Sequence, residues 1–160
     1  MCQLSSFIGT VAGIVRTVST ICLAILFILI IFQVAVRYFF SYVPFFTEEF
    51  ARYAMIWMTL FAGAVSVRDN THIRIDLLRE LLWDRAPLVV IAVDDLIDFL
   101  SLFVFIAVAV HGLGTLTLIA GQTSDGVRFP LIFPYAGVPA AFFLAALFSI
   151  ERILRRTARL

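Results

Sequence analysis

Hydrophobic residues dominate four long stretches of the chain, and short polar or arginine-containing segments separate them. The stretches cover residues 17–36, 50–67, 99–119 and 131–150. A helix of about 20 residues is roughly 30 Å long, which matches the hydrocarbon core of a bilayer. Because backbone amides inside a bilayer must be satisfied within the protein, helices are favoured over strands. The pattern predicts an all-α polytopic membrane protein with four transmembrane helices, forming a single membrane domain over residues 1–160.

A shorter pattern lies between the second and third stretches. Over residues 76–85, four leucines fall on one helical stripe while the charged residues project elsewhere, and Trp83 suits a membrane interface. This spacing predicts a short amphipathic interfacial helix that lies in the membrane surface or against a partner.

The segments that flank the spans carry more local signals. Residues 1–15 either extend the first helix or lie along the membrane surface. The aromatic-rich connection before the second span resembles the aromatic belt at a membrane interface, and Thr47 is a candidate N-cap for that helix. Three prolines, at positions 130, 134 and 139, predict an irregular or kinked start to the fourth span.

Composition supports the membrane class and disfavours several functions. The chain is 62% hydrophobic and 14% charged, whereas soluble domains carry about 25% charged residues. No basic cluster has the aromatic interleaving typical of nucleic-acid binding. Cys2 and Cys22 cannot form a disulfide framework, and two histidines, His72 and His111, are too few for haem or metal sites. We therefore expect no enzyme activity, no catalytic residue, no cofactor, no metal and no nucleic-acid partner.

His111 is an ionisable side chain in the third span. Polar residues inside membrane helices either pack and hydrogen-bond against neighbouring helices or mark a pathway such as a proton relay. Its sequence context, beside Gly112 and Gly114, suits packing, and both roles stay open at this point.

Arginine is distributed unevenly between the two sides of the predicted membrane domain. Arg16 precedes the first span, four arginines lie between spans two and three, and four follow span four; the other side has Arg37, Arg52 and Arg128. Because cytoplasmic loops are enriched in Lys and Arg, this bias places both termini and the 68–87 loop in the cytoplasm. In a bacterium, such a protein would be a multi-pass inner-membrane protein in contact with lipid.

Two polar clusters are candidate functional sites. At the outer end of span two, Glu48 and Glu49 stand four and three residues before Arg52, so one arginine can pair with either acid. The cluster is interpreted as a helix-end ion pair, as a docking site for a protein on the external side, or as both.

The second cluster lies on the cytoplasmic side. It combines the loop residues Arg68, His72, Arg74 and Asp76 with Asp94, Asp95 and Asp98, which share one face at the start of span three. We expect this acidic face at the cytoplasmic interface, where a salt-bridge network would tie the loop to the third span.

These residues also carry a family resemblance. The order Arg37-Tyr38, Glu48-Glu49-x-x-Arg52, Trp57, Gly63-Ala64, Arg68 and His72-Ile73-Arg74-Ile75-Asp76 resembles the small four-span subunit of tripartite ATP-independent periplasmic (TRAP) transporters. Pro134, Tyr135 and Pro139 fit the family more loosely. Phe45 and Phe46 stand where the family often has tryptophan, and Asn70 stands where it often has glycine.

The resemblance implies a non-catalytic membrane subunit. In such systems a periplasmic substrate-binding protein delivers an organic acid to a large membrane subunit, which holds the substrate and sodium sites, while the small subunit acts as scaffold and aids docking. The alternative is an autonomous four-helix exporter that works as a dimer, which would need a membrane-embedded acid at its dimer axis. An electron-transfer subunit is disfavoured by the histidine count.

Overall fold

The computed structural model describes residues 2–41, 44–69, 87–124 and 126–157. Four helices make up most of these residues: α1 (Cys2–Phe40), α2 (Phe45–Asp69), α4 (Pro87–Ile119) and α5 (Ile132–Thr157). All four are long and apolar enough to cross a membrane. This confirms the all-α class with four membrane-spanning helices. The amphipathic helix expected over residues 76–85 lies outside the described residues.

Two helices extend well beyond the predicted spans. Helix α1 begins at Cys2, so the apolar residues before Thr17 continue the first helix instead of forming a separate surface segment. It ends at Ser41, whose φ of 53° and amide bond to the Arg37 carbonyl (3.1 Å) form a left-handed helix cap. Helix α4 begins at Pro87, a residue whose missing amide hydrogen suits a first helical position.

The other two helix starts differ from the sequence-based expectations. Thr47 lies inside the first turn of α2, and its hydroxyl donates to the Pro44 carbonyl at 2.6 Å, so it is not the N-cap. Helix α5 is continuous from Ile132 and passes through Pro139, so its first turns are helical and not irregular. The alternative expectation of a kinked start stays a prediction. Pro134 falls in the first turn, where amide hydrogens have no intrahelical acceptor, and it therefore costs no hydrogen bond.

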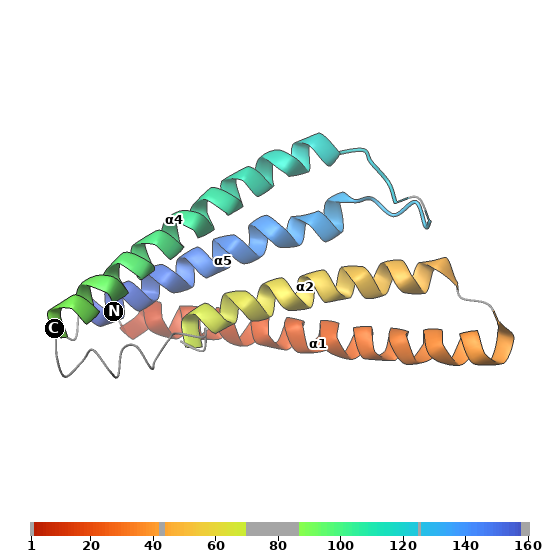
Figure 1. The fold of residues 1–160 in the computed structure, drawn as a ribbon, viewed down its shortest axis with the longest axis horizontal. Coiled ribbons are helices and arrows are strands. Elements are labelled where there is room, and N and C mark those ends of the chain that lie inside the picture. The colour runs from red at the N-terminus through yellow and green to blue at the C-terminus, as the bar shows by residue number, and fades with distance from the viewer. Residues whose placement is uncertain (1, 42–43, 70–86, 125, 158–160) are drawn as a thin grey trace.

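The helices pack in the spatial order α1, α2, α5, α4. Helix α2 packs against α1 and α5, and α4 packs against α5. Figure 1 shows that the α1–α2 pair and the α4–α5 pair lie close together at the end that carries both chain termini and diverge toward the other end. The α4–α5 connection bends back toward the start of α2 at that wider end.

The packed core lies where α1, α2 and α5 meet. Its largest fully buried side chain is Phe148, which is 1% exposed, and small residues such as Ala12, Ala64 and Ala141 surround it. Small side chains allow the close helix approach that stabilises membrane bundles, where van der Waals contact replaces the hydrophobic effect. Gly137 on α5 makes the same kind of contact, since a Cβ there would lie 3.3 Å from the Trp57 ring.

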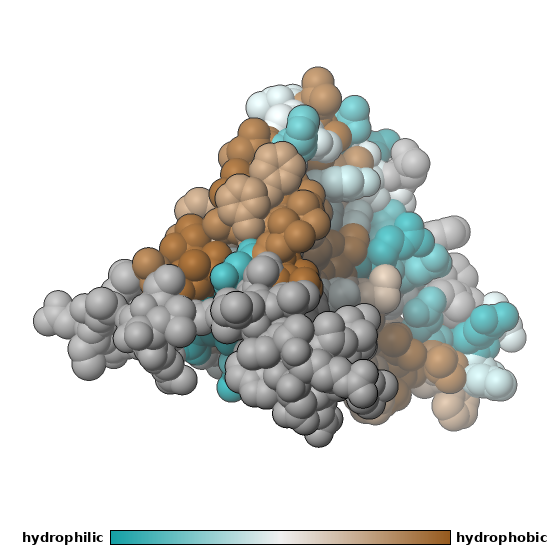
Figure 2. All heavy atoms as spheres, turned by 60° about the vertical axis from the view of Figure 1, so that its left-hand side comes forward, coloured by the Kyte–Doolittle hydropathy of each residue, from teal (hydrophilic) through white to brown (hydrophobic). Residues whose placement is uncertain are grey.

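The two outer helices expose most of their apolar surface. In the spanning window of α1 only 6% of residues are buried, and in that of α4 only 11%, compared with 44% in α5. Large apolar side chains are exposed along both outer helices, and apolar residues form a broad area beside a hydrophilic one on the face that Figure 2 shows. This surface must face lipid tails or another membrane protein.

Candidate functional site

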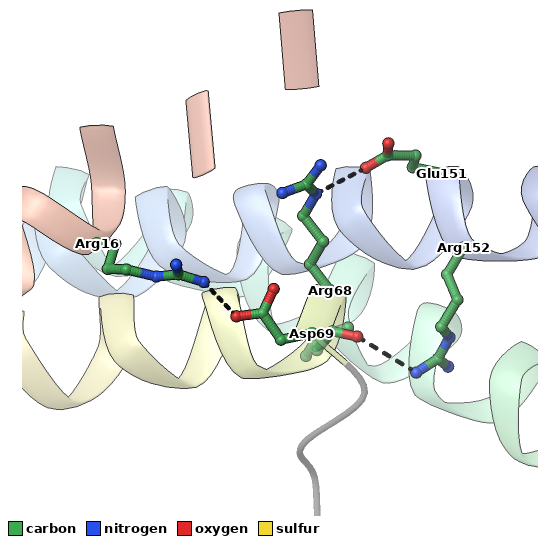
Figure 3. A network of polar contacts seen from close by, with 6 residues as sticks. Arg16, Arg68, Asp69, Glu151 and Arg152 are labelled. Carbon is green, nitrogen blue, oxygen red and sulfur yellow. Dashed lines mark hydrogen bonds and ion pairs between the residues drawn. The ribbon is translucent and has the colours of Figure 1, made fainter. Parts of the chain in front are cut away.

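Three ion pairs connect the four helices at the end of the bundle where the termini lie (Figure 3). Each pair bridges one helix–helix contact, so the pairs form a chain across the whole array. From α1 to α4 they are Arg16–Asp69, Arg68–Glu151 and Arg152–Asp98.

The two inner pairs are the buried ones. The carboxylates of Glu151 and Asp98 are each 5% exposed, and Arg68 Nε lies 3.2 Å from Glu151 Oε2. Arg152 also donates to the Val67 carbonyl at 3.5 Å, which ties α5 to the end of α2. Breaking a buried pair leaves an uncompensated charge and is strongly destabilising, whereas an exposed pair contributes little. The chemistry of this cluster therefore suits fixing the relative positions of α2, α5 and α4.

This chain of pairs includes only part of the predicted cytoplasmic network. Arg68 and Asp98 belong to it, and Asp98 is buried with Arg152 of α5 as an ion-pair partner. Asp94 and Asp95 lie one turn earlier on α4, partly buried and exposed respectively, and both interact with other groups. His72, Arg74 and Asp76 lie outside the described residues.

Sequence reasoning missed four of the residues that form these ion pairs: Arg16, Asp69, Glu151 and Arg152. The sequence signal that could have revealed them is their position at the ends of the apolar runs. Glu151 and Arg152 follow an uncharged apolar run directly, and Arg68-Asp69 closes another. Charged residues at the same end of neighbouring spans are brought together once the helices pack.

At the opposite end of the bundle, Glu48 and Glu49 have different partners. Arg52 Nη2 donates to Glu48 Oε1 at 3.1 Å, and both side chains are about three-fifths exposed at 62% and 61%. Glu49 instead accepts a hydrogen bond from the Gly126 amide at 3.1 Å, and its second carboxylate oxygen is buried without a partner among the described residues. The Glu48–Arg52 ion pair and the Glu49–Gly126 hydrogen bond are therefore separate interactions.

Glu49 contacts a compact connection between α4 and α5. Backbone hydrogen bonds fold this connection on itself, among them Ser124 amide to Phe129 carbonyl (2.9 Å) and Leu131 amide to Gln122 carbonyl (3.1 Å). We call residues 120–131 the external hairpin, after the side of the membrane that the arginine distribution predicts for it. Its Phe129 ring packs edge-on against Phe50 of α2, with ring centroids 5.7 Å apart. The hairpin thus joins the start of α2 at the end where the helix pairs diverge.

A groove of about 1010 Å³ lies between α2, the external hairpin and α5. Its walls are apolar toward Ile56, Leu60 and Val138, and its polar groups include Arg52 and Glu49. Among the residues that the structure describes, no three His, Cys, Asp or Glu side chains come together as metal ligands.

Comparisons with known proteins point to one family. Residues 26–159 match the family model described as "Tripartite ATP-independent periplasmic transporters, DctQ component". The chain is 33% identical over 135 residues to the isethionate TRAP transporter permease protein DctMQ of Oleidesulfovibrio alaskensis, a match that covers 78% of this chain and 20% of that protein. It is 26% identical over 133 residues to a TRAP transporter small permease protein of Haemophilus influenzae, covering 82% of this chain and 80% of that protein.

Proposed function

The chain belongs to the DctQ family of TRAP transporter components, and from this premise we propose that it is the non-catalytic scaffold subunit of a secondary transporter. The transporter would take up organic acids with a sodium gradient and a periplasmic binding protein. Substrate and sodium would bind in the larger membrane subunit that the family implies. The same four-helix unit, as a single membrane domain, would serve as the surface on which that subunit is held.

The observation that carries this proposal is the extent of exposed apolar surface on α1 and α4. Helices that bury so little against their own bundle are available to pack against a larger membrane protein. The matched region makes up only one fifth of the DctMQ relative, which leaves most of that chain for another component. A scaffold role is consistent with both facts.

We place both termini and the ion-pair end on the cytoplasmic side of a bacterial inner membrane. The support is the arginine distribution, since Arg16, Arg68 and Arg152 all lie at the end that carries the termini. Glu48, Arg52 and the external hairpin then face the periplasm, where a binding protein would arrive.

Co-purification tests the scaffold role. The affinity-tagged full chain is expressed with the large membrane subunit from the same organism, and the complex is extracted in mild detergent. We expect the two to elute together in constant ratio. A chain that purifies alone and catalyses transport in liposomes without the large subunit would contradict the proposal and favour the exporter alternative.

The exposed Glu48–Arg52 pair is our candidate for contact with the binding protein. One carboxylate on the rim of such a contact steers encounter more than it adds affinity. We therefore expect Glu48→Gln to lower transport by the reconstituted complex when binding protein is limiting, and the deficit to disappear when it is saturating. Arg52→Ala should instead lower the amount of assembled complex, because Glu48 would be left without its partner near the bilayer.

The control for Glu48→Gln is Asp95→Asn, an exposed carboxylate at the other end of the bundle, which should leave the dependence on binding-protein concentration unchanged. Normal transport by Glu48→Gln at every concentration would mean that the pair is only a helix-end ion pair.

A further inference from the structure

His111 is exposed to the surroundings of α4 although it lies well inside a membrane span. It stands eight residues before the helix end at Ile119, which corresponds to about 12 Å of helix. Among the described residues, none hydrogen-bonds with its imidazole; the nearby Thr115 hydroxyl donates to the His111 backbone carbonyl at 3.0 Å. A polar ring at this depth is costly against lipid tails and is normally covered by a neighbouring helix.

The residues around His111 repeat at intervals of four and three along α4. We name this set the His111 stripe: Leu100, Val104, Ala107, His111, Gly114 and Leu118. Ala107 is partly buried and the other five are exposed. This alternating spacing is the seam pattern of two helices packed side by side, and small residues within it let the two backbones approach.

The stripe does not face the other helices that the structure describes. Helix α4 meets α5 through another side, where Gly112 lies against Pro139 and the Phe105 ring contacts Phe142. By contrast, a Cβ added at Gly114 would meet no heavy atom within 4 Å. Helix α4 is also at the edge of the array, with α5 as its packing neighbour (Figure 1).

We infer that the His111 stripe is the surface against which one transmembrane helix of the larger membrane subunit packs. That helix presents a hydrogen-bonding side chain to the His111 imidazole and comes closest at Gly114. This inference rests on the proposed function and adds the contact surface to it. His111 then has a helix-packing role, one of the two that its sequence context left open.

The test compares variants of the tagged full chain, each co-expressed with the large membrane subunit and purified in mild detergent. His111→Leu removes the hydrogen bond and should lower the ratio of large to small subunit about three-fold, as expected for one interhelical hydrogen bond in a membrane. His111→Gln keeps a donor and an acceptor and should restore the ratio. Gly114→Leu blocks the close approach and should lower the ratio about ten-fold.

Gly63→Leu is the matched control, because a Cβ at Gly63 also meets nothing within 4 Å and Gly63 lies on α2, which is not one of the two outer helices. It should leave the ratio unchanged. The thermal midpoint of each variant, purified without the large subunit, shows whether the variant still folds. It should not fall below that of the wild type, because His111 and Gly114 are both exposed on α4.

A photo-crosslinking residue at Leu118 identifies what covers the stripe. A cross-link to the large subunit is expected. If the wild-type chain binds the large subunit but the stripe variants do so equally well, or if the cross-link joins two copies of this chain or only lipid, the stripe is not this surface and the scaffold role stands. If the wild-type chain does not bind the large subunit at all, the proposed function fails first.

Discussion

At the scale of single residues, the buried pair Arg152–Asp98 should dominate the stability of the ion-pair end. Asp98→Asn leaves the guanidinium partly uncompensated between α4 and α5, so we expect the free energy of unfolding to fall by about 3 kcal/mol. The measurement is unfolding of the purified chain in mixed detergent micelles with increasing SDS, followed by tryptophan fluorescence.

Asp69→Asn is the comparison for this prediction. It breaks the Arg16–Asp69 pair, in which the arginine side chain is 63% exposed, so the loss should stay below about 1 kcal/mol. Equal losses in the two variants would show that burial does not set the strength of these pairs.

Glu49 and Gly126 should act as one unit that holds the external hairpin on α2. A Cβ at position 126 would collide with the Glu49 carboxylate, so Gly126→Ala and Glu49→Ala both remove the same hydrogen bond. Each should lower stability by about 1 to 2 kcal/mol, and the double variant should lose little more than either single one. Fully additive losses would mean that the two residues contribute independently.

Which charged residues pair was only partly visible in the sequence. Helical spacing along one segment gave Glu48 and Arg52 as neighbours, and the structure places them 3.1 Å apart. The same spacing also allowed Glu49 as a partner of Arg52. It could not reveal that Glu49 instead accepts a hydrogen bond from the Gly126 amide, because that amide lies 77 residues away in the sequence. Pairs such as Arg68–Glu151 likewise depend on which helices become neighbours, and local spacing carries no information on that.

At the scale of the elements, the α4–α5 contact should depend on Gly112. A Cβ there would lie 3.2 Å from Pro139 Cδ, and a larger side chain would push the two helices apart. We expect Gly112→Leu to lower the free energy of unfolding by about 2 kcal/mol. Thermal unfolding of the purified chain in detergent, followed by circular dichroism, measures the change.

Gly63→Leu is the matched substitution in α2, because a Cβ at Gly63 meets nothing within 4 Å. It should leave stability unchanged or raise it slightly, since glycine is a poor helix former. If the Gly63 variant is as unstable as the Gly112 variant, the loss does not come from the α4–α5 contact.

Hydropathy predicted the four helices better than it predicted their ends. The spans follow from the length of the apolar runs, but α1 starts at Cys2 because the residues before Thr17 remain apolar and helical. Packing explains why Pro139 does not end the helix. A proline interrupts the backbone ladder, yet here its ring fills the space beside Gly112, and the helix continues through it.

At the scale of the whole molecule, the structure sharpens the test of orientation. In the topology predicted from the sequence, nine arginines belong to the side of the termini and three to the opposite side. The acids divide eight to three, so the net charges, 9 − 8 = +1 and 3 − 3 = 0, are nearly equal. At the first end, three of the nine arginines are paired with Asp69, Glu151 and Asp98. The net charge therefore predicts no orientation, whereas the count of basic residues, which gives acids little weight, predicts that the termini are cytoplasmic.

We therefore expect the termini in the cytoplasm and Ser41 in the periplasm. In a variant with both native cysteines changed to serine, Ser41→Cys should react with a membrane-impermeant maleimide added to intact spheroplasts, since Ser41 is exposed at the external end. A reporter enzyme active only in the cytoplasm, fused after Leu160, should be active. A protected Ser41→Cys together with an inactive reporter would invert every loop, and the Glu48–Arg52 pair would then face the cytoplasm, where no periplasmic binding protein could reach it.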